Sequence, residues 1–206
     1  MKAWCGLVLV LISGVALAAD APADIVRRTS DQLFELIDAN RAAYQAEPAR
    51  LQDEVRRYLL PHVDTQYSAR LVLGQHGRGL DAEKVQAFAR ALSDLLVRRY
   101  AHGLLEFKSR DQVQILPDQG GNTERMTRVR TKVRLESGSE AAVDYVFRRQ
   151  DGTWRVFDVI VEGISYVATF RTQIGEEIRR DGFDRVLTRL ESGELQLKEA
   201  EHDQAA

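Results

Sequence analysis

The sequence contains one cysteine, Cys5, and it lies in a segment that we expect the mature protein to lack. Met1-Lys2 gives a short basic start, residues 3–17 are apolar, and Ala16-Leu17-Ala18 has the small-x-small form of a signal-peptidase site. Cleavage after Ala18 predicts a secreted chain without disulfides or thiol chemistry, stabilised by its core alone. Because Cys5 begins the apolar run instead of following it, we expect no lipoprotein anchor.

Long apolar runs and a strong charge of one sign are also missing. After residue 18 no run is long enough to span a bilayer. Removing Lys2 leaves 28 Lys and Arg against 31 Asp and Glu, a net charge of −3. A nearly neutral exported protein is a poor candidate for nucleic-acid binding. The remaining 188 of 206 residues suit one domain, which we place at residues 19–191, followed by a charged, frayed tail at 192–206.

Metal ligands and catalytic motifs are scarce. The four histidines, His62, His76, His102 and His202, lack the spacing of a zinc site. There is no G-x-S-x-G motif, although a Ser/His/Asp triad stays open because its order differs between folds. The loop at residues 74–79 has three glycines and an arginine, but its spacing is not that of a P-loop and no strand precedes it. We interpret it as a connection between helices.

The apolar periodicity predicts helices first and strands afterwards. Helical spacing covers residues 24–43, 48–59, a short segment capped by Asp64, and 82–106 capped by Asp81. The last of these would extend roughly 36 Å, enough to lie across a small sheet. A period of two then predicts strands at 113–115, 126–135, 141–148 and 154–162, and helices return at 164–180 and 184–191. This order indicates an α+β fold with helices on one face of a curved antiparallel sheet.

Residues 154–165, WRVFDVIVEGIS, form the segment around which we expect the rest to pack. Strict alternation puts Trp154, Val156, Asp158 and Ile160 on one face, and apolar residues also occupy the other. A strand that is apolar on both faces is usually covered on both, so we expect it to be central and to run directly into the next helix.

The same segment resembles the MlaC family, the periplasmic phospholipid-binding components of a lipid-transport ABC system, also called toluene-tolerance proteins. Two further blocks carry the resemblance: residues 59–63 with 67–74, and Gly182-Phe183-Asp184 followed by Leu187 and Leu190. The resemblance implies an NTF2-like sheet half with a helical half closing over it, and a phospholipid held in an apolar cavity. It also implies an inner-membrane ABC complex and an outer-membrane lipoprotein–porin complex as partners, and neither cofactor nor catalysis.

Ten apolar or aromatic residues are our candidates for contact with lipid. They lie on the predicted long helix, the short helix before it and the inner faces of the strands: Tyr67, Leu71, Leu92, Leu96, Tyr100, Val133, Tyr145, Phe147, Trp154 and Val156. We expect the long helix to face Trp154. Periodicity alone does not separate a cavity from a filled core, so an ordinary core is the alternative for each of them.

Asp158 carries the enzyme alternative. A carboxylate in an apolar strand needs partners or a raised pKa, and such carboxylates mark active sites. NTF2-like folds host small-molecule isomerases, but a structural role for Asp158 with arginine or backbone amides is the simpler interpretation. A periplasmic adaptor without a ligand is the third possibility.

A basic stripe projects from the strand at 126–135 by simple alternation. It consists of Arg128, Arg130, Lys132 and Arg134. The functional interpretation is docking to an acidic partner or an anionic head group. Neutralisation by Glu136, Glu140 or Asp144 on the next strand would instead indicate an ordinary solvated face.

Overall fold

The computed structural model describes residues 20–135 and 138–198. The predicted signal peptide lies outside these residues. The helices are α1 (Pro22–Ala46), α2 (Pro48–Tyr58), α3 (Thr65–Leu73), α4 (Ala82–Tyr100), α5 (Tyr166–Asp181) and α6 (Phe183–Ser192). Short 3₁₀ helices connect them: η1 (Leu60–His62), η2 (Gly74–Gly77), η3 (Ala101–Glu106) and η4 (Arg110–Gln112). None of the helices in the described ranges is long and apolar enough to cross a membrane.

The strands form one antiparallel sheet and confirm the predicted α+β class. They are β1 (Val113–Ile115), β2 (Met126–Arg134), β3 (Glu140–Gln150), β4 (Thr153–Val161) and β5 (Ile164–Ser165), in the order β1-β2-β3-β4-β5. The central strand is therefore β3, and the prediction that β4 is central is wrong. Beyond β4 the sheet holds only the two-residue β5, but α3 and α5 also pack on β4. These helices explain why β4 is apolar on both faces.

A β-bulge at Phe157 changes which residues of β4 share a face. Val146 pairs with Asp158 and Phe147 pairs with Val156, so Phe157 has no opposite residue. Val156 consequently lies on the same face as Val159, which pairs with Tyr145. The predicted alternation is wrong beyond the bulge, because Asp158 lies on the face opposite to Val156.

Two tight turns flank β4. Asp151 and Gly152 have φ of 49° and 79°, the positive pair that a type I′ hairpin turn requires, and they join β3 to β4 as predicted. Glu162 and Gly163 repeat this geometry with φ of 49° and 82°. The chain therefore folds back as β5 before α5 begins at Tyr166, whereas the sequence predicted a strand running directly into a helix.

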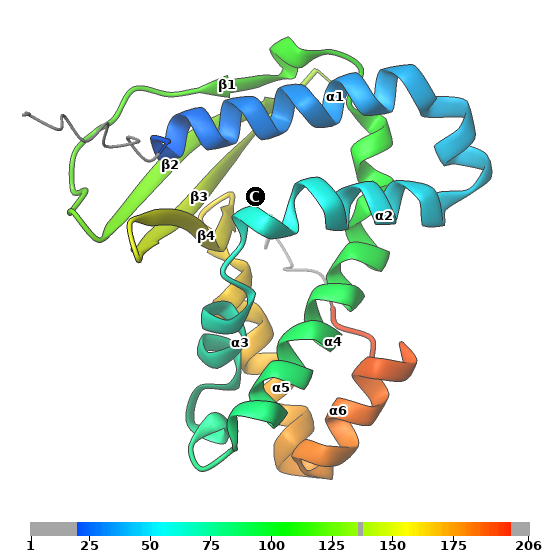
Figure 1. The fold of residues 1–206 in the computed structure, drawn as a ribbon, viewed down its shortest axis with the longest axis vertical. Helices are drawn as coiled ribbons and strands as arrows, with labels where there is room; N and C mark the ends of the chain where they lie inside the picture. Colours follow the sequence, from blue (N-terminus) through cyan, green and yellow to red (C-terminus); the bar gives the residue numbers. More distant parts are fainter. Residues whose placement is uncertain (1–19, 136–137, 199–206) are drawn as a thin grey trace, which may run out of the picture.

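The buried residues form three clusters that divide the fold into a sheet half and a helical half (Figure 1). In the sheet half, α1 packs on the inner face through Ile25, Val26, Val129 and Phe147. A second cluster joins α1, α2, α4 and η3. The third fills the helical half between α3, α4, α5 and α6. It is α1, and not α4, that covers the sheet, so the predicted approach of the helix at 82–106 to Trp154 is wrong.

The folded chain continues beyond residue 191. Leu195 and Leu197 are buried in the core of the helical half, and the Gln173 side chain hydrogen-bonds the backbone of Lys198 in both directions. The predicted frayed tail is therefore wrong for residues 192–198. Residues 199–206 lie outside the described part of the chain.

Candidate functional site

An apolar cavity of about 260 Å³ lies between α1 and the inner face of the sheet. Thirteen apolar residues line it, contributed by α1, the segment around η1, the segment around η3, and the strands: Ile25, Val26, Leu33, Phe34, Ile37, Leu59, Val63, Leu104, Phe107, Val113, Val133, Val156 and Val159. The polar members are Thr29, Ser30, His62 and Tyr145, and no Asp, Glu, Lys or Arg of the described chain belongs to the lining. Such a cavity suits an uncharged hydrocarbon chain.

The sequence builds this wall from two periodicities. On α1, the residues at 25, 26, 29, 33 and 37 are buried at helical spacing and line the cavity. On β2, the buried residues at 129, 131 and 133 alternate with basic residues that are exposed or half-buried, and Val133 lines the cavity. The bulge at Phe157 then brings both Val156 and Val159 to the cavity side of β4.

Two ionisable side chains line the cavity, and burial acts on both. Burial raises the pKa of the Tyr145 phenol, so this hydroxyl remains neutral. The pKa of His62 is lowered, first by burial and then by the positive charge of Arg28, while Asp20 opposes the shift. The Thr29 hydroxyl is buried among the lining residues and has no hydrogen-bond partner within the described chain.

The ten candidate lipid residues separate into three groups. Val133, Tyr145 and Val156 line the cavity. Phe147 and Trp154 lie beside it, in the cluster under α1. Leu92, Leu96 and Tyr100 instead belong to the core of the helical half, Tyr67 packs edge-on against Phe157, and Leu71 is partly buried on α3.

No residue of the α1 wall is among the ten predicted lipid residues. Its apolar stripe is visible in the sequence, but a stripe shows only that a helix has a buried face and not what that face covers. Val159 was missed because strict alternation places it on the other side of β4.

Asp158 lies outside the cavity and orders the start of α5. Its Oδ2 accepts a hydrogen bond from Ser165 Oγ at 2.6 Å, and its Oδ1 accepts one from the Val167 amide at 3.0 Å. Ser165 Oγ in turn accepts from the Ala168 amide as the N-cap of α5. These contacts give Asp158 a structural role, which is the simpler of the two roles predicted for it.

Three of the four charges of the basic stripe are paired with neighbouring carboxylates. Arg128 pairs with Asp144 at 3.5 Å, Lys132 with Glu140 at 2.9 Å, and Arg134 with Asp111 at 3.7 Å. Arg130 donates to the neutral Gln119 amide oxygen at 2.9 Å. This pattern is that of a solvated sheet face, and the docking role stays a prediction.

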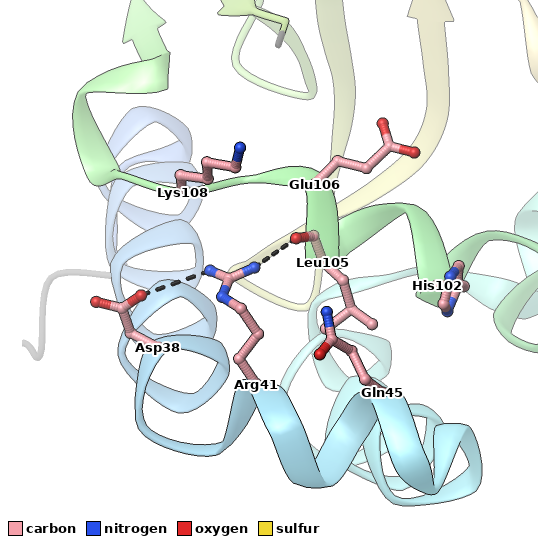
Figure 2. Close-up of a pocket in the computed structure, with 7 residues that line it drawn as sticks. All are labelled: Asp38, Arg41, Gln45, His102, Leu105, Glu106 and Lys108. Carbon is pink, nitrogen blue, oxygen red and sulfur yellow. Dashed lines mark hydrogen bonds and ion pairs between the residues drawn. The ribbon is translucent and has the colours of Figure 1, made fainter.

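A larger cleft, of about 520 Å³, is polar and open (Figure 2). Leu105 is the single apolar residue among the seven that line it. Arg41 crosses it from α1 and donates hydrogen bonds to the carbonyl oxygens of Leu105 and of Phe107, the latter at 2.8 Å. The cleft does not suit hydrocarbon, but its arginine holds the segment whose Leu104 and Phe107 close the apolar cavity.

Neither a metal cluster nor a phosphate loop is formed by the described residues. No three His, Cys, Asp or Glu side chains in these ranges are grouped closely enough to hold a metal ion. The glycine loop contains η2 and connects α3 to α4, with the Arg171 side chain packed against Gly74.

Known proteins resemble this chain in sequence or in fold. The chain is 25% identical over 191 residues to the intermembrane phospholipid transport system binding protein MlaC of Haemophilus influenzae, covering 90% of this chain and 88% of that protein. It is 29% identical over 180 residues to the toluene tolerance protein ttg2D of Pseudomonas putida, covering 85% and 83%. A phospholipid-binding protein from Ralstonia solanacearum, solved in complex with a phospholipid, has the same fold with a TM-score of 0.75 and 22% identity, covering 87% of this chain and 99% of that one. The sequence model of the MlaC protein family matches residues 27–192, and the chain therefore belongs to the MlaC family.

Proposed function

We propose that the mature protein is a periplasmic phospholipid carrier that holds acyl tails in the cavity under α1 and performs no covalent chemistry. The observation that carries the proposal is the lining itself, thirteen apolar side chains without a carboxylate, lysine or arginine. The names of the two relatives and the phospholipid in the solved neighbour support the choice of ligand. The predicted signal peptide supports the periplasmic location.

The energetics favour shuttling. Burying one methylene is worth about 0.8 kcal/mol, so two tails of ~16 carbons represent roughly 20 kcal/mol or more relative to water. A bilayer offers the same gain, and a carrier therefore needs only to match a membrane to exchange lipid with it. The direction of transfer then depends on the membrane partners. We propose an inner-membrane ABC complex and an outer-membrane lipoprotein–porin complex, a choice supported by the transport-system name of the Haemophilus relative.

The size of the cavity indicates that it widens on loading. Its volume of about 260 Å³ is below the roughly 300–1,000 Å³ of pockets that enclose a drug-sized ligand, and a diacyl lipid is larger still. The walls therefore have to separate, with α1 moving away from both the sheet and the Leu104–Phe107 segment. Arg41 connects these two elements and is expected to resist their separation.

Lipid extraction followed by mass spectrometry of the purified mature protein tests the proposal. A carrier should yield about one phospholipid per protein, and delipidated protein should take up phospholipid from vesicles. An enzyme or an adaptor should be lipid-free in both measurements, and that result would remove the carrier function.

A further inference from the structure

A hydroxyl group without a hydrogen-bond partner lies in the wall of the apolar cavity. It belongs to Thr29 on α1, a residue that is 7% exposed and lines the cavity. Its Oγ1 atom is buried and forms no hydrogen bond with any described residue. A buried hydroxyl that has lost its hydrogen bonds to water destabilises the folded protein unless another partner replaces them. A ligand that supplies this partner therefore gains affinity.

The backbone of α1 does not satisfy this hydroxyl, although helical threonines often donate to the carbonyl four residues earlier. Thr169, Thr172 and Thr188 do so in this protein, at 3.0, 3.3 and 3.0 Å. For Thr29 the corresponding carbonyl is that of Ile25, and this hydrogen bond is absent from the described residues. The Thr29 proton is therefore available to a molecule in the cavity.

Thr29 lies beside the place where the cavity approaches the surface. The next residue, Ser30, lines the apolar cavity and also a small cleft outside it, between α1 and β1, and Val26 does the same. Farther along α1 the lining continues with apolar residues, among them Leu33 and Ile37. The hydroxyl of Thr29 is therefore placed where the rim of the cavity gives way to its apolar wall.

Resting on the proposed function, we propose that the Thr29 hydroxyl donates a hydrogen bond to an ester carbonyl of the bound glycerophospholipid. The two ester carbonyls of a diacyl lipid are the polar groups nearest its tails, and they accept hydrogen bonds but cannot donate them. With an ester at Thr29, the tails extend along the apolar wall and the head group lies towards the cleft at Ser30. Because the Oγ1 atom is buried while the cavity is closed, the contact forms when α1 moves on loading.

The test is a competition between two lipids that differ only in the ester carbonyls. Delipidated protein is incubated with vesicles that contain equal amounts of dioleoyl-phosphatidylglycerol and its diether analogue, di-O-oleyl-phosphatidylglycerol. Mass spectrometry then measures the ratio of diester to diether lipid on the re-isolated protein. This ratio should be about two- to tenfold higher for the wild type than for Thr29→Val, the range expected for one neutral hydrogen bond. The vesicles are the same for both proteins, so the difference isolates the hydroxyl.

Thr131→Val is the matched control. Thr131 is the other buried threonine of the described chain, but its hydroxyl already donates to the Val143 carbonyl at 2.7 Å. This variant should keep the wild-type ratio, and so should Thr29→Ser, which retains a hydroxyl. Thr29→Ala is a second variant without the hydroxyl and should give the same low ratio as Thr29→Val. A wild-type ratio in both variants that lack the hydroxyl, or an equal fall in Thr131→Val, would overturn the proposal.

The stability of the lipid-free variants gives an independent readout. Thr29→Val should unfold at the same urea concentration as the wild type or a higher one, because it loses a hydroxyl that has no partner. Thr131→Val loses a formed hydrogen bond and should unfold at a lower concentration. Equal losses in the two variants would show that the Thr29 hydroxyl is already bonded in the lipid-free protein, which contradicts the proposal. A protein that takes up neither lipid would instead reject the carrier function itself, so the two failures are distinguishable.

Discussion

The Nε atom of Arg148 lies 3.1 Å from the Oδ2 atom of Asp64, and this ion pair joins β3 to the start of α3. Asp64 also accepts a hydrogen bond from the Tyr67 amide at 3.0 Å, and its own amide donates to the Val156 carbonyl at 2.7 Å. The Arg148 guanidinium lies 4.1 Å from the centre of the Tyr67 ring. One buried carboxylate therefore links the sheet half to the helical half.

We expect Asp64→Ala to lower the free energy of unfolding by about 3 kcal/mol or more, because it removes a helix cap and leaves Arg148 without its partner. Asp81→Ala is the matched control, since Asp81 caps α4 through the Lys84 amide but faces no arginine in the described ion pairs, and it should cost about 1 kcal/mol. Urea denaturation measures both. Equal losses would mean that the ion pair contributes nothing beyond the cap.

A second prediction separates the cavity from the filled core by making the same substitution in each. Val159→Phe adds a ring where the wall has open space, so stability should be kept while co-purifying phospholipid falls severalfold. Val186→Phe adds the same ring to the core of the helical half, where Val186 is fully buried, and should cost about 1–3 kcal/mol. Thermal melting of delipidated protein and phosphorus analysis of protein as purified measure the two properties. A Val159→Phe variant that retains its full lipid content would contradict the proposed tail site.

We expect enlargement of Leu96 to have the same effect as enlargement of Val186. Because Leu96 packs against the core of the helical half, Leu96→Trp should lose stability and keep lipid. The opposite result would extend the tail site into the helical half.

Arg41 should hold the cavity closed. Arg41→Gln removes the charged donor to the Leu105 and Phe107 carbonyls, which we expect to cost about 1–2 kcal/mol and to speed lipid release severalfold. Arg50→Gln provides the comparison, because among the ion pairs of the described residues Arg50 has an exposed contact with Glu47 at 3.9 Å and no other. Stopped-flow transfer of a fluorescent phospholipid to vesicles measures release, and identical rates in the two variants would exclude a role for the Arg41 contact.

The lowered pKa of His62 gives stability a defined pH dependence. The folded-state pKa lies below the ordinary value of 6.5, so the unfolded chain binds a proton more readily. The stability that the fold gains from a neutral His62 is therefore fully present above pH 6.5. It is lost as the pH falls through the folded-state pKa. In the lipid-free protein, His62→Asn should reduce the loss of stability between pH 7 and pH 5, as measured by urea denaturation at several pH values. An unchanged pH profile would show that His62 titrates normally.

The docking role of the basic stripe can be tested at Arg130, the member whose partner is neutral. If the stripe docks to an acidic partner, Arg130→Glu should slow association with the proposed inner-membrane transport complex at low salt and leave bound lipid unchanged. Arg57→Glu makes the same charge reversal on α2, where Arg57 pairs with Glu54, and serves as the control outside the sheet. Equal association rates for both variants and wild type would leave the stripe as a solvated face.

Local chemistry made much of this fold predictable. Asp64 and Asp81 were identified as caps because an Asp before an amphipathic stripe satisfies the amides of the first turn, and both accept such a hydrogen bond. The Asp151-Gly152 hairpin was also predictable from the residues of the turn itself, because few residue pairs adopt two consecutive positive φ values. The Glu162-Gly163 turn has the same geometry but was missed, since glutamate is an uncommon residue there.

The cavity wall was less predictable because it depends on contacts distant in sequence. Nothing in the stripe of α4 or in that of α1 specifies which helix covers the sheet, and Leu92 and Ile37 are equally apolar. The bulge at Phe157 is likewise set by tertiary contacts and not by the composition of β4. Once its position is known, the cavity side of Val159 and the outward direction of Asp158 both follow.

Phe157 has no pairing partner in the β3–β4 ladder. Its carbonyl accepts a hydrogen bond from Ser68 Oγ at 2.7 Å, and its ring packs edge-on against Tyr67, with 5.1 Å between the ring centres. Deleting residue 157 would leave Val156 and Asp158 opposite the same partners as before, but α3 would lose both contacts. The extra residue in this strand therefore serves the contact with α3. In a relative that lacks a residue at this position, we expect the packing of α3 on the strand to differ while the pairing of β3 with β4 is kept.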